Sequence, residues 1–83
     1  MNWYKLDKIA SLNVFVETAN SYGEMVIYIN GDRYEYQLPY TAEEIGREIM
    51  MYMRKNNLKK VNKYIRWLDQ FITKKPEKST ESE

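Results

Sequence analysis

The chain has 83 residues, a formal net charge of +1 and neither cysteine nor histidine. This composition excludes disulfides, zinc sites built on cysteine or histidine, and catalysis by a histidine base or a cysteine nucleophile. A chain of this length forms one small domain, whose single core supplies little net stability. No apolar run approaches the roughly 18 residues of a membrane span, and the first residues lack a signal-peptide pattern. We therefore expect a cytoplasmic protein without membrane contact.

Residues 1–10 fit two interpretations. Trp3, Leu6 and Ile9 suit one side of a short helix, whereas the alternation between Tyr4 and Ile9 suits an edge strand. We expect a short strand or an irregular segment that covers an edge of the domain.

Three alternating segments follow, at residues 12–18, 25–29 and 33–38. Asn30-Gly31 predicts a two-residue hairpin turn, since both positions of such a turn need positive φ. Residues 20–23 predict a four-residue loop between the first two segments. Both turns place the same side chains on one face, which predicts the core face of a three-stranded antiparallel meander. This face comprises Leu12, Val14, Val16, Met25, Ile27, Ile29, Tyr34, Tyr36 and Leu38.

The opposite face of this sheet carries Phe15, Tyr28 and Arg33 in one transverse row. Exposed aromatic rows stack nucleobases in some RNA-binding sheets and hold protein partners in other domains. The next row contains Glu17 and Glu35, whose charges oppose a polyanion. Cover by the N-terminal segment is the first expectation for this row, and a protein-binding surface is the second.

After Pro39, the sequence has the pattern of a helix start, with Thr41 as N-cap, Glu44 as its capping-box partner and Tyr40 packed against Ile45. The helix that follows has one apolar side, and Gly46 lies within it. An interior glycine costs a helix about 1 kcal/mol relative to alanine. We therefore expect Gly46 to allow close approach of the sheet or of the next helix.

A second helix is predicted after Asn57. Tyr64, Trp67 and Phe71 flank its apolar side, while Lys59, Lys63 and Arg66 lie on the far side. Its apolar seam comprises Leu58, Val61, Ile65, Leu68 and Ile72.

The stretch from Arg54 to Lys75 holds eight basic residues and one acid, whereas the rest of the chain is acidic. The favoured interpretation is a solvated basic side with the aromatic residues in the core. The alternative is nucleic acid binding, with Lys59, Lys63 and Arg66 on phosphates and Trp67 or Tyr64 stacked on a base or inserted beside it. A DNA-reading helix-turn-helix is disfavoured, because the first helix is long and its exposed side is acidic.

These patterns predict an α+β domain over residues 1–75: a three-stranded antiparallel β-meander followed by two helices packed on one face, with a short N-terminal element at an edge. Residues 76–83 are polar, and we expect a disordered tail. No pattern specifies a catalytic centre, a cofactor, a metal site or a small-molecule substrate, so we expect no enzyme.

The expected function is that of a small protein-binding module. Its partner-binding residues would be Phe15, Tyr28 and Arg33. Such a module would be an accessory or inhibitory regulator that acts through a protein partner or a homodimer. The alternative is a nucleic-acid-binding protein that uses the basic second helix.

Overall fold

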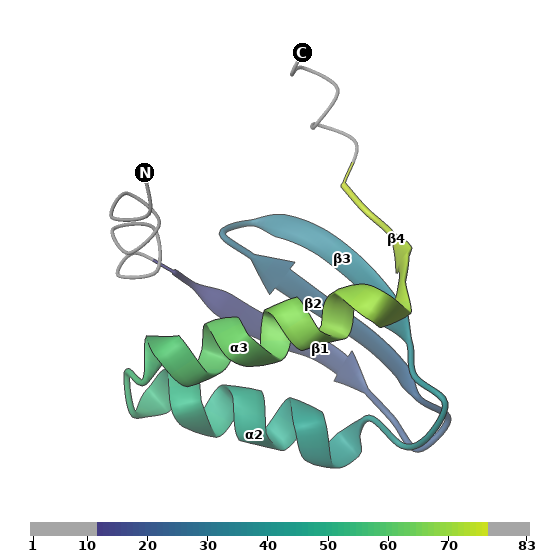
Figure 1. Cartoon of the computed structure of the whole chain (residues 1–83), viewed down its shortest axis with the longest axis horizontal. Coiled ribbons are helices and arrows are strands. Elements are labelled where there is room, and N and C mark those ends of the chain that lie inside the picture. Colours follow the sequence, from purple (N-terminus) through teal and green to yellow (C-terminus); the bar gives the residue numbers. More distant parts are fainter. Residues whose placement is uncertain (1–11, 77–83) are drawn as a thin grey trace.

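The computed structural model describes residues 12–76, and Figure 1 shows their arrangement. The predictions for residues 1–10, and those for the tail beyond Pro76, lie outside the described residues. The elements, in chain order, are β1 (Val14–Ala19), β2 (Glu24–Ile29), β3 (Asp32–Gln37), α2 (Glu43–Arg54), α3 (Leu58–Leu68), the 3-10 turn η1 (Asp69–Phe71) and β4 (Ile72–Lys74). The predicted α+β fold, an antiparallel sheet with two following helices, is confirmed. Within residues 12–76, no helix has the length and apolar character needed to cross a membrane.

The hairpin between β2 and β3 has the predicted register. Ile27 faces Tyr34 and Met25 faces Tyr36. Asn30 and Gly31 have φ values of 51° and 90°, as a type I′ turn requires. The local turn chemistry is therefore sufficient to set this register.

The pairing of β1 with β2 matches the prediction only at the end distant from the loop. Val16 faces Ile27 as expected, but a bulge between Val16 and Thr18 then shifts the register, so that Ala19 faces Met25. The connecting loop, residues 20–23, has the predicted length of four residues, and the bulge in β1 accounts for the shifted register. The Asn20 side-chain oxygen accepts hydrogen bonds from the amides of Tyr22 and Glu24, both at 3.0 Å, and stabilises this loop.

A fourth strand, β4, adds to the predicted meander and completes the sheet order β1-β2-β3-β4. Ile72 was predicted to extend the apolar seam of the second helix, and this prediction is wrong. The helix ends at Leu68, and Ile72 pairs with Tyr36 of β3. The apolar spacing continues past Leu68, but β3 offers a free edge whose backbone groups bind the next segment instead.

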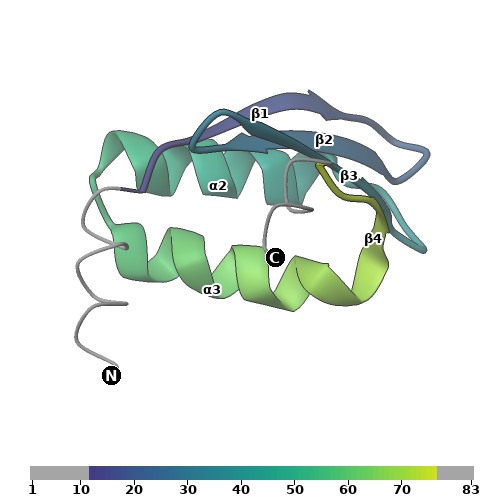
Figure 2. The same cartoon turned by 90° about the horizontal axis from the view of Figure 1, so that it is seen from above.

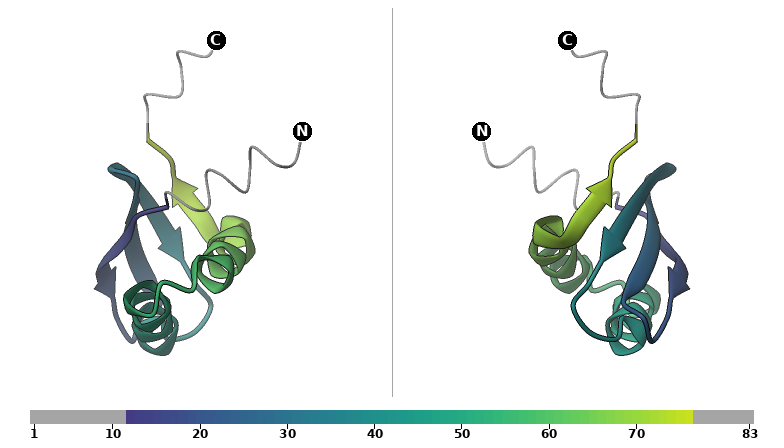
Figure 3. Two further views of the ribbon diagram at one scale, coloured as in Figure 1. Left: turned by 90° about the vertical axis from the view of Figure 1, so that its left-hand side faces the viewer. Right: turned by 90° about the vertical axis from the view of Figure 1, so that its right-hand side faces the viewer.

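Both helices lie on one side of the sheet, as Figure 2 shows from above and Figure 3 shows along the helix axes. Every residue of the predicted core face belongs to the hydrophobic core or packs against it. The fully buried helix side chains Ile49, Val61 and Leu68 complete this core. Tyr36 is only 3% exposed, and its hydroxyl has no hydrogen-bond partner among the described residues.

Gly46 allows α2 to approach β1 closely. A Cβ atom at this position would lie 2.6 Å from the Cβ of Ala19 in β1. The predicted role of this glycine is therefore confirmed, with the sheet rather than α3 as the neighbour. Next to this contact, the Val16 amide donates a hydrogen bond to the Met50 Sδ at 3.4 Å.

The predicted N-cap of the first helix is wrong by one residue. Ala42 is the N-cap, and the helix begins at Glu43. The reason is a tertiary contact: the Ala42 amide donates to the Asn20 carbonyl at 2.9 Å, which fixes the chain before the helix starts. The Thr41 hydroxyl still accepts a hydrogen bond from the Glu43 amide, at 3.2 Å.

Candidate binding surfaces

The first candidate surface is the row predicted on the outer face of the sheet, and the structure brings its three residues together. Phe15 faces Tyr28 across β1 and β2, and Tyr28 faces Arg33 across β2 and β3. Phe15 is 56% exposed. Phe15, Tyr28 and Arg33 are called the outer row below.

Two carboxylates surround the one charged member of the outer row. The Arg33 guanidinium contacts the Glu35 carboxylate, and its Nε lies 3.8 Å from the Glu17 Oε1. The hydrogen bond to Glu35 is the main cause that raises the pKa of Arg33, and a hydrogen bond with Tyr28 acts in the same direction. The outer row therefore presents aromatic side chains beside a guanidinium whose charge is already compensated.

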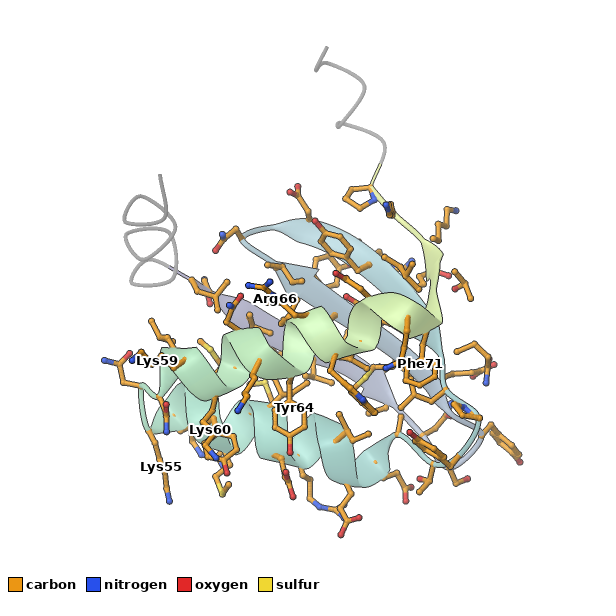
Figure 4. The ribbon with its side chains drawn as sticks, viewed as in Figure 1. Lys55, Lys59, Lys60, Tyr64, Arg66 and Phe71 are labelled. Atoms are coloured by element: carbon orange, nitrogen blue, oxygen red, sulfur yellow. The ribbon has the colours of Figure 1, made fainter. Side chains whose placement is uncertain are left out.

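The structure does not gather all four residues predicted to bind nucleic acid around one hollow, although Lys59 and Lys63 line the same one. Lys63 and Trp67 line one groove between the helices, but Lys59 and Arg66 do not line it. Figure 4 shows Arg66 and Tyr64 on opposite sides of α3, with Lys59 near the start of that helix. Trp67 thus shares the groove with one member of the predicted ridge, Lys63.

The second candidate surface is the groove itself, with a volume of about 390 Å³. It runs between the second half of α2 and the middle of α3. Its lining residues are Tyr52, Lys60, Lys63, Tyr64 and Trp67. These five residues are called the interhelical groove below.

Sequence reasoning missed Tyr52 and Lys60 as members of this groove. Tyr52 falls on the apolar side of the first helix, and its spacing indicates no partner on the second helix. Lys60 precedes Tyr64 by four residues and Trp67 by seven, so helical spacing alone aligns these three side chains. That alignment was the available signal, whereas the position of Tyr52 depends on how the two helices pack.

Contacts within the helix pair hold the aromatic walls of the groove in place. The Tyr64 hydroxyl donates a hydrogen bond to the Glu48 carboxylate, and this bond, followed by burial, raises the pKa of Tyr64 to about 12. The rings of Tyr52 and Tyr64 lie 6.2 Å apart, and the Lys60 Nζ lies 5.5 Å from the centre of the Tyr52 ring.

Trp67, at the other end of the groove, is held by a second set of rings. Its ring meets Phe71 edge-on, with centroids 5.2 Å apart and planes at 75°. Phe71 in turn contacts Tyr40 at 6.3 Å. These contacts fix the orientation of Trp67 while leaving it 38% exposed.

Among residues 12–76, no group of three or more acidic, histidine or cysteine side chains is placed to hold a metal ion. What the two surfaces offer is aromatic contact area with basic groups beside it. In comparisons with known proteins, no family model, no curated protein and no solved structure matches this chain.

Proposed function

We propose that this chain is a non-enzymatic protein-binding module, and that the outer row of the sheet is its binding surface. The observation that carries this proposal is the 56% exposure of Phe15, the second residue of β1, which faces Tyr28 of β2. An exposed phenylalanine beside a tyrosine and an arginine has the composition of an interface centre, since aromatic residues and arginine contribute much of the energy in such interfaces.

The electrostatics of the outer row favour a protein over a polyanion. Glu17 and Glu35 compensate the charge of Arg33 and add negative charge at the rim. A nucleic acid phosphate would be repelled by this rim, whereas a protein surface can cover Phe15 and exchange hydrogen bonds with the rim.

The edge strand β1 supports binding through the face of the sheet rather than by strand addition. Its bulge disrupts the regular ladder, and the Val16 amide is already bound to the Met50 sulfur. The proposed partner therefore presents apolar side chains to Phe15 and Tyr28, and does not add a strand beside β1. The proposal includes a cytoplasmic location and a role as an accessory or inhibitory regulator.

A photo-crosslinking amino acid at position 15 provides the first test. Proteins that crosslink are identified, produced in pure form and titrated with the unmodified chain. We expect Phe15→Thr to weaken the binding of such a partner at least tenfold, because an interface centre contributes about 2 kcal/mol or more. Threonine keeps a high β-propensity at this position.

Tyr22→Thr is the matched control, since Tyr22 is 80% exposed but lies in the loop between β1 and β2. A partner that binds Phe15→Thr as tightly as the unmodified chain would contradict the proposal. Sedimentation of the chain alone identifies the case in which the partner is a second copy.

A further inference from the structure

We propose that the interhelical groove binds single-stranded nucleic acid, with one base stacked on Trp67 and the adjoining phosphate held by Lys60 and Lys63. The groove lies on the helix pair and the outer row lies on the far face of the sheet, so this proposal is independent of the protein-binding function proposed above. It shares Lys63 and Trp67 with the nucleic-acid surface predicted from the sequence, but it uses Lys60 in place of Lys59 and Arg66.

The groove combines the two chemical features that an unpaired nucleotide needs. Three aromatic rings form its walls, and two exposed lysines stand beside them. A nucleobase offers a flat apolar face to the rings, and its phosphate offers negative charge to the lysines. A purely apolar ligand would leave the lysines unused, and a small anion would leave the rings unused.

The aromatic walls are positioned before any ligand arrives. Glu48 holds the Tyr64 hydroxyl, and Phe71 holds the Trp67 ring edge-on. These side chains therefore lose less conformational entropy on binding than unrestrained aromatic side chains on the surface would lose. Trp67 keeps 38% of its surface exposed, which leaves area for a base.

The charges around the groove are complementary to a phosphate backbone, mainly on the α3 side. Figure 4 shows Lys55, Lys59 and Lys60 gathered at the end where α2 leads into α3. Glu48 lies on the α2 side, and its carboxylate already accepts the Tyr64 hydroxyl hydrogen bond. We therefore expect the phosphates to follow α3 along Lys60 and Lys63.

A single strand fits this groove better than a duplex or an acidic peptide. A duplex hides the faces of its bases in the stack, so it would use the lysines but not Trp67. An acidic peptide would likewise satisfy the lysines without requiring the aromatic walls. Both are outcomes that the following experiment distinguishes.

The test uses the full chain in a Trp3→Phe background, in which Trp67 is the single tryptophan of the two that the sequence contains. A single-stranded oligothymidylate is titrated while the fluorescence of Trp67 is followed at several salt concentrations. We expect quenching and an affinity that falls as salt rises. Lys63→Gln should reduce the slope of log affinity against log salt by about 0.7, the value for one lost phosphate contact in a single strand.

Trp67→Leu, followed by fluorescence anisotropy of a labelled oligonucleotide, tests the stacked base. We expect its affinity to fall about tenfold, a typical loss for one stacked base. Because Lys60→Gln and Lys63→Gln change exposed side chains only, they keep the test decisive if Trp67→Leu does not fold.

Lys75→Gln is the matched control, since it removes the same charge from an exposed position after β4. Loss of affinity in Lys75→Gln equal to that in Lys63→Gln would overturn the proposal, as would unchanged Trp67 fluorescence. Equal affinity for duplex DNA, polyphosphate or polyglutamate would also overturn it. Phe15→Thr should bind the oligonucleotide normally, so failure here and failure of the protein-binding proposal are separate results.

Discussion

The two faces of the sheet are built from the same three alternating strands but have different surroundings. The inner face is covered by α2 and α3, and Met25 and Ile27 on it are fully buried. On the outer face, Phe15 is more exposed than buried, and Arg33 is compensated by neighbouring carboxylates. We infer that the inner face holds the fold together, and we expect substitutions on the outer face to have little effect on stability. Substitutions on the two faces should therefore separate stability from binding.

The largest effect is expected from the centre of the inner layer. Ile49→Ala should lower the free energy of unfolding by about 2–5 kcal/mol, because it leaves a cavity where a fully buried side chain packed. Urea denaturation followed by circular dichroism measures this loss. Since a small domain has little stability in reserve, Ile49→Val provides a milder change with an expected loss of about 0.5–1.5 kcal/mol. Met51→Ala, on the other side of α2, is the control, and an equal loss there would refute the proposed role of the inner layer.

A smaller loss is expected where α2 touches β1. Gly46→Ala should destabilise the fold by about 1–3 kcal/mol, because the new methyl group would lie 2.6 Å from the Ala19 Cβ. The higher helix propensity of alanine would otherwise stabilise the helix by about 1 kcal/mol. Combining Gly46→Ala with Ala19→Gly removes the clash. Denaturation of the unmodified chain, the two single variants and the double variant should therefore give a favourable coupling energy between the two positions. Additive losses would show that the contact with Ala19 is not the cause.

The inner face also contains one polar group whose removal should be favourable. Tyr36→Phe should raise the free energy of unfolding by about 1 kcal/mol, because the tyrosine hydroxyl is buried without a hydrogen-bond partner among residues 12–76. Tyr28→Phe on the outer face is the control, since the Tyr28 hydroxyl interacts with Arg33. Thermal unfolding of both variants measures the difference, and destabilisation by Tyr36→Phe would indicate that its hydroxyl has a partner in solution.

The helix pair should lose stability at high pH. The pKa of Tyr64 is raised from 10.0 to about 12, so the folded chain keeps this proton to a higher pH than the unfolded chain. The contribution of Tyr64 is complete below about pH 10 and is lost as the pH rises towards about 12. Burial raises the pKa of Tyr36 and acts in the same direction.

Urea denaturation at a series of pH values measures this effect. Tyr64→Phe should flatten part of the decline, whereas Tyr22→Phe, in an exposed loop, should leave it unchanged. If the free energy of unfolding of Tyr64→Phe falls with pH as steeply as that of the unmodified chain, the hydrogen bond from Tyr64 to Glu48 does not persist in solution.

The smallest effect on stability is expected on the outer face. Phe15→Thr should change the free energy of unfolding by less than about 0.5 kcal/mol, because the side chain is more than half exposed and threonine suits a strand. Denaturation under the conditions used for Ile49→Ala gives a direct comparison. A loss of several kcal/mol would show that Phe15 is covered in solution, and would remove the distinction between the two faces.

Local patterns were sufficient to predict the core face of the sheet and the hairpin at Asn30-Gly31. Alternation places Val14, Ile27 and Tyr36 on one face whatever lies beyond the strands, and a positive-φ turn fixes the β2–β3 register. The three residues of the outer row follow from the same registers. Their function stays a prediction, because the registers specify which side chains are adjacent and not what they bind.

Other features depend on contacts between distant segments. β4 forms because the free edge of β3 accepts Ile72, although the spacing around Ile72 is helical. The start of α2 is set by the carbonyl of Asn20, which binds the Ala42 amide. Neither contact has a signal in the residues adjacent to it along the chain.

By itself, the sequence determined the alternation of the strands, the amphipathic helices and the concentration of basic residues after Met53. Each of these depends on neighbours within a few positions, where backbone geometry relates spacing to orientation. The packing of the helices, by contrast, brings Tyr52 of α2 to Lys60, Lys63 and Trp67 of α3 around one groove. The physical reason is that the packing of two helices depends on the whole core between them and the sheet, and no local pattern contains that information.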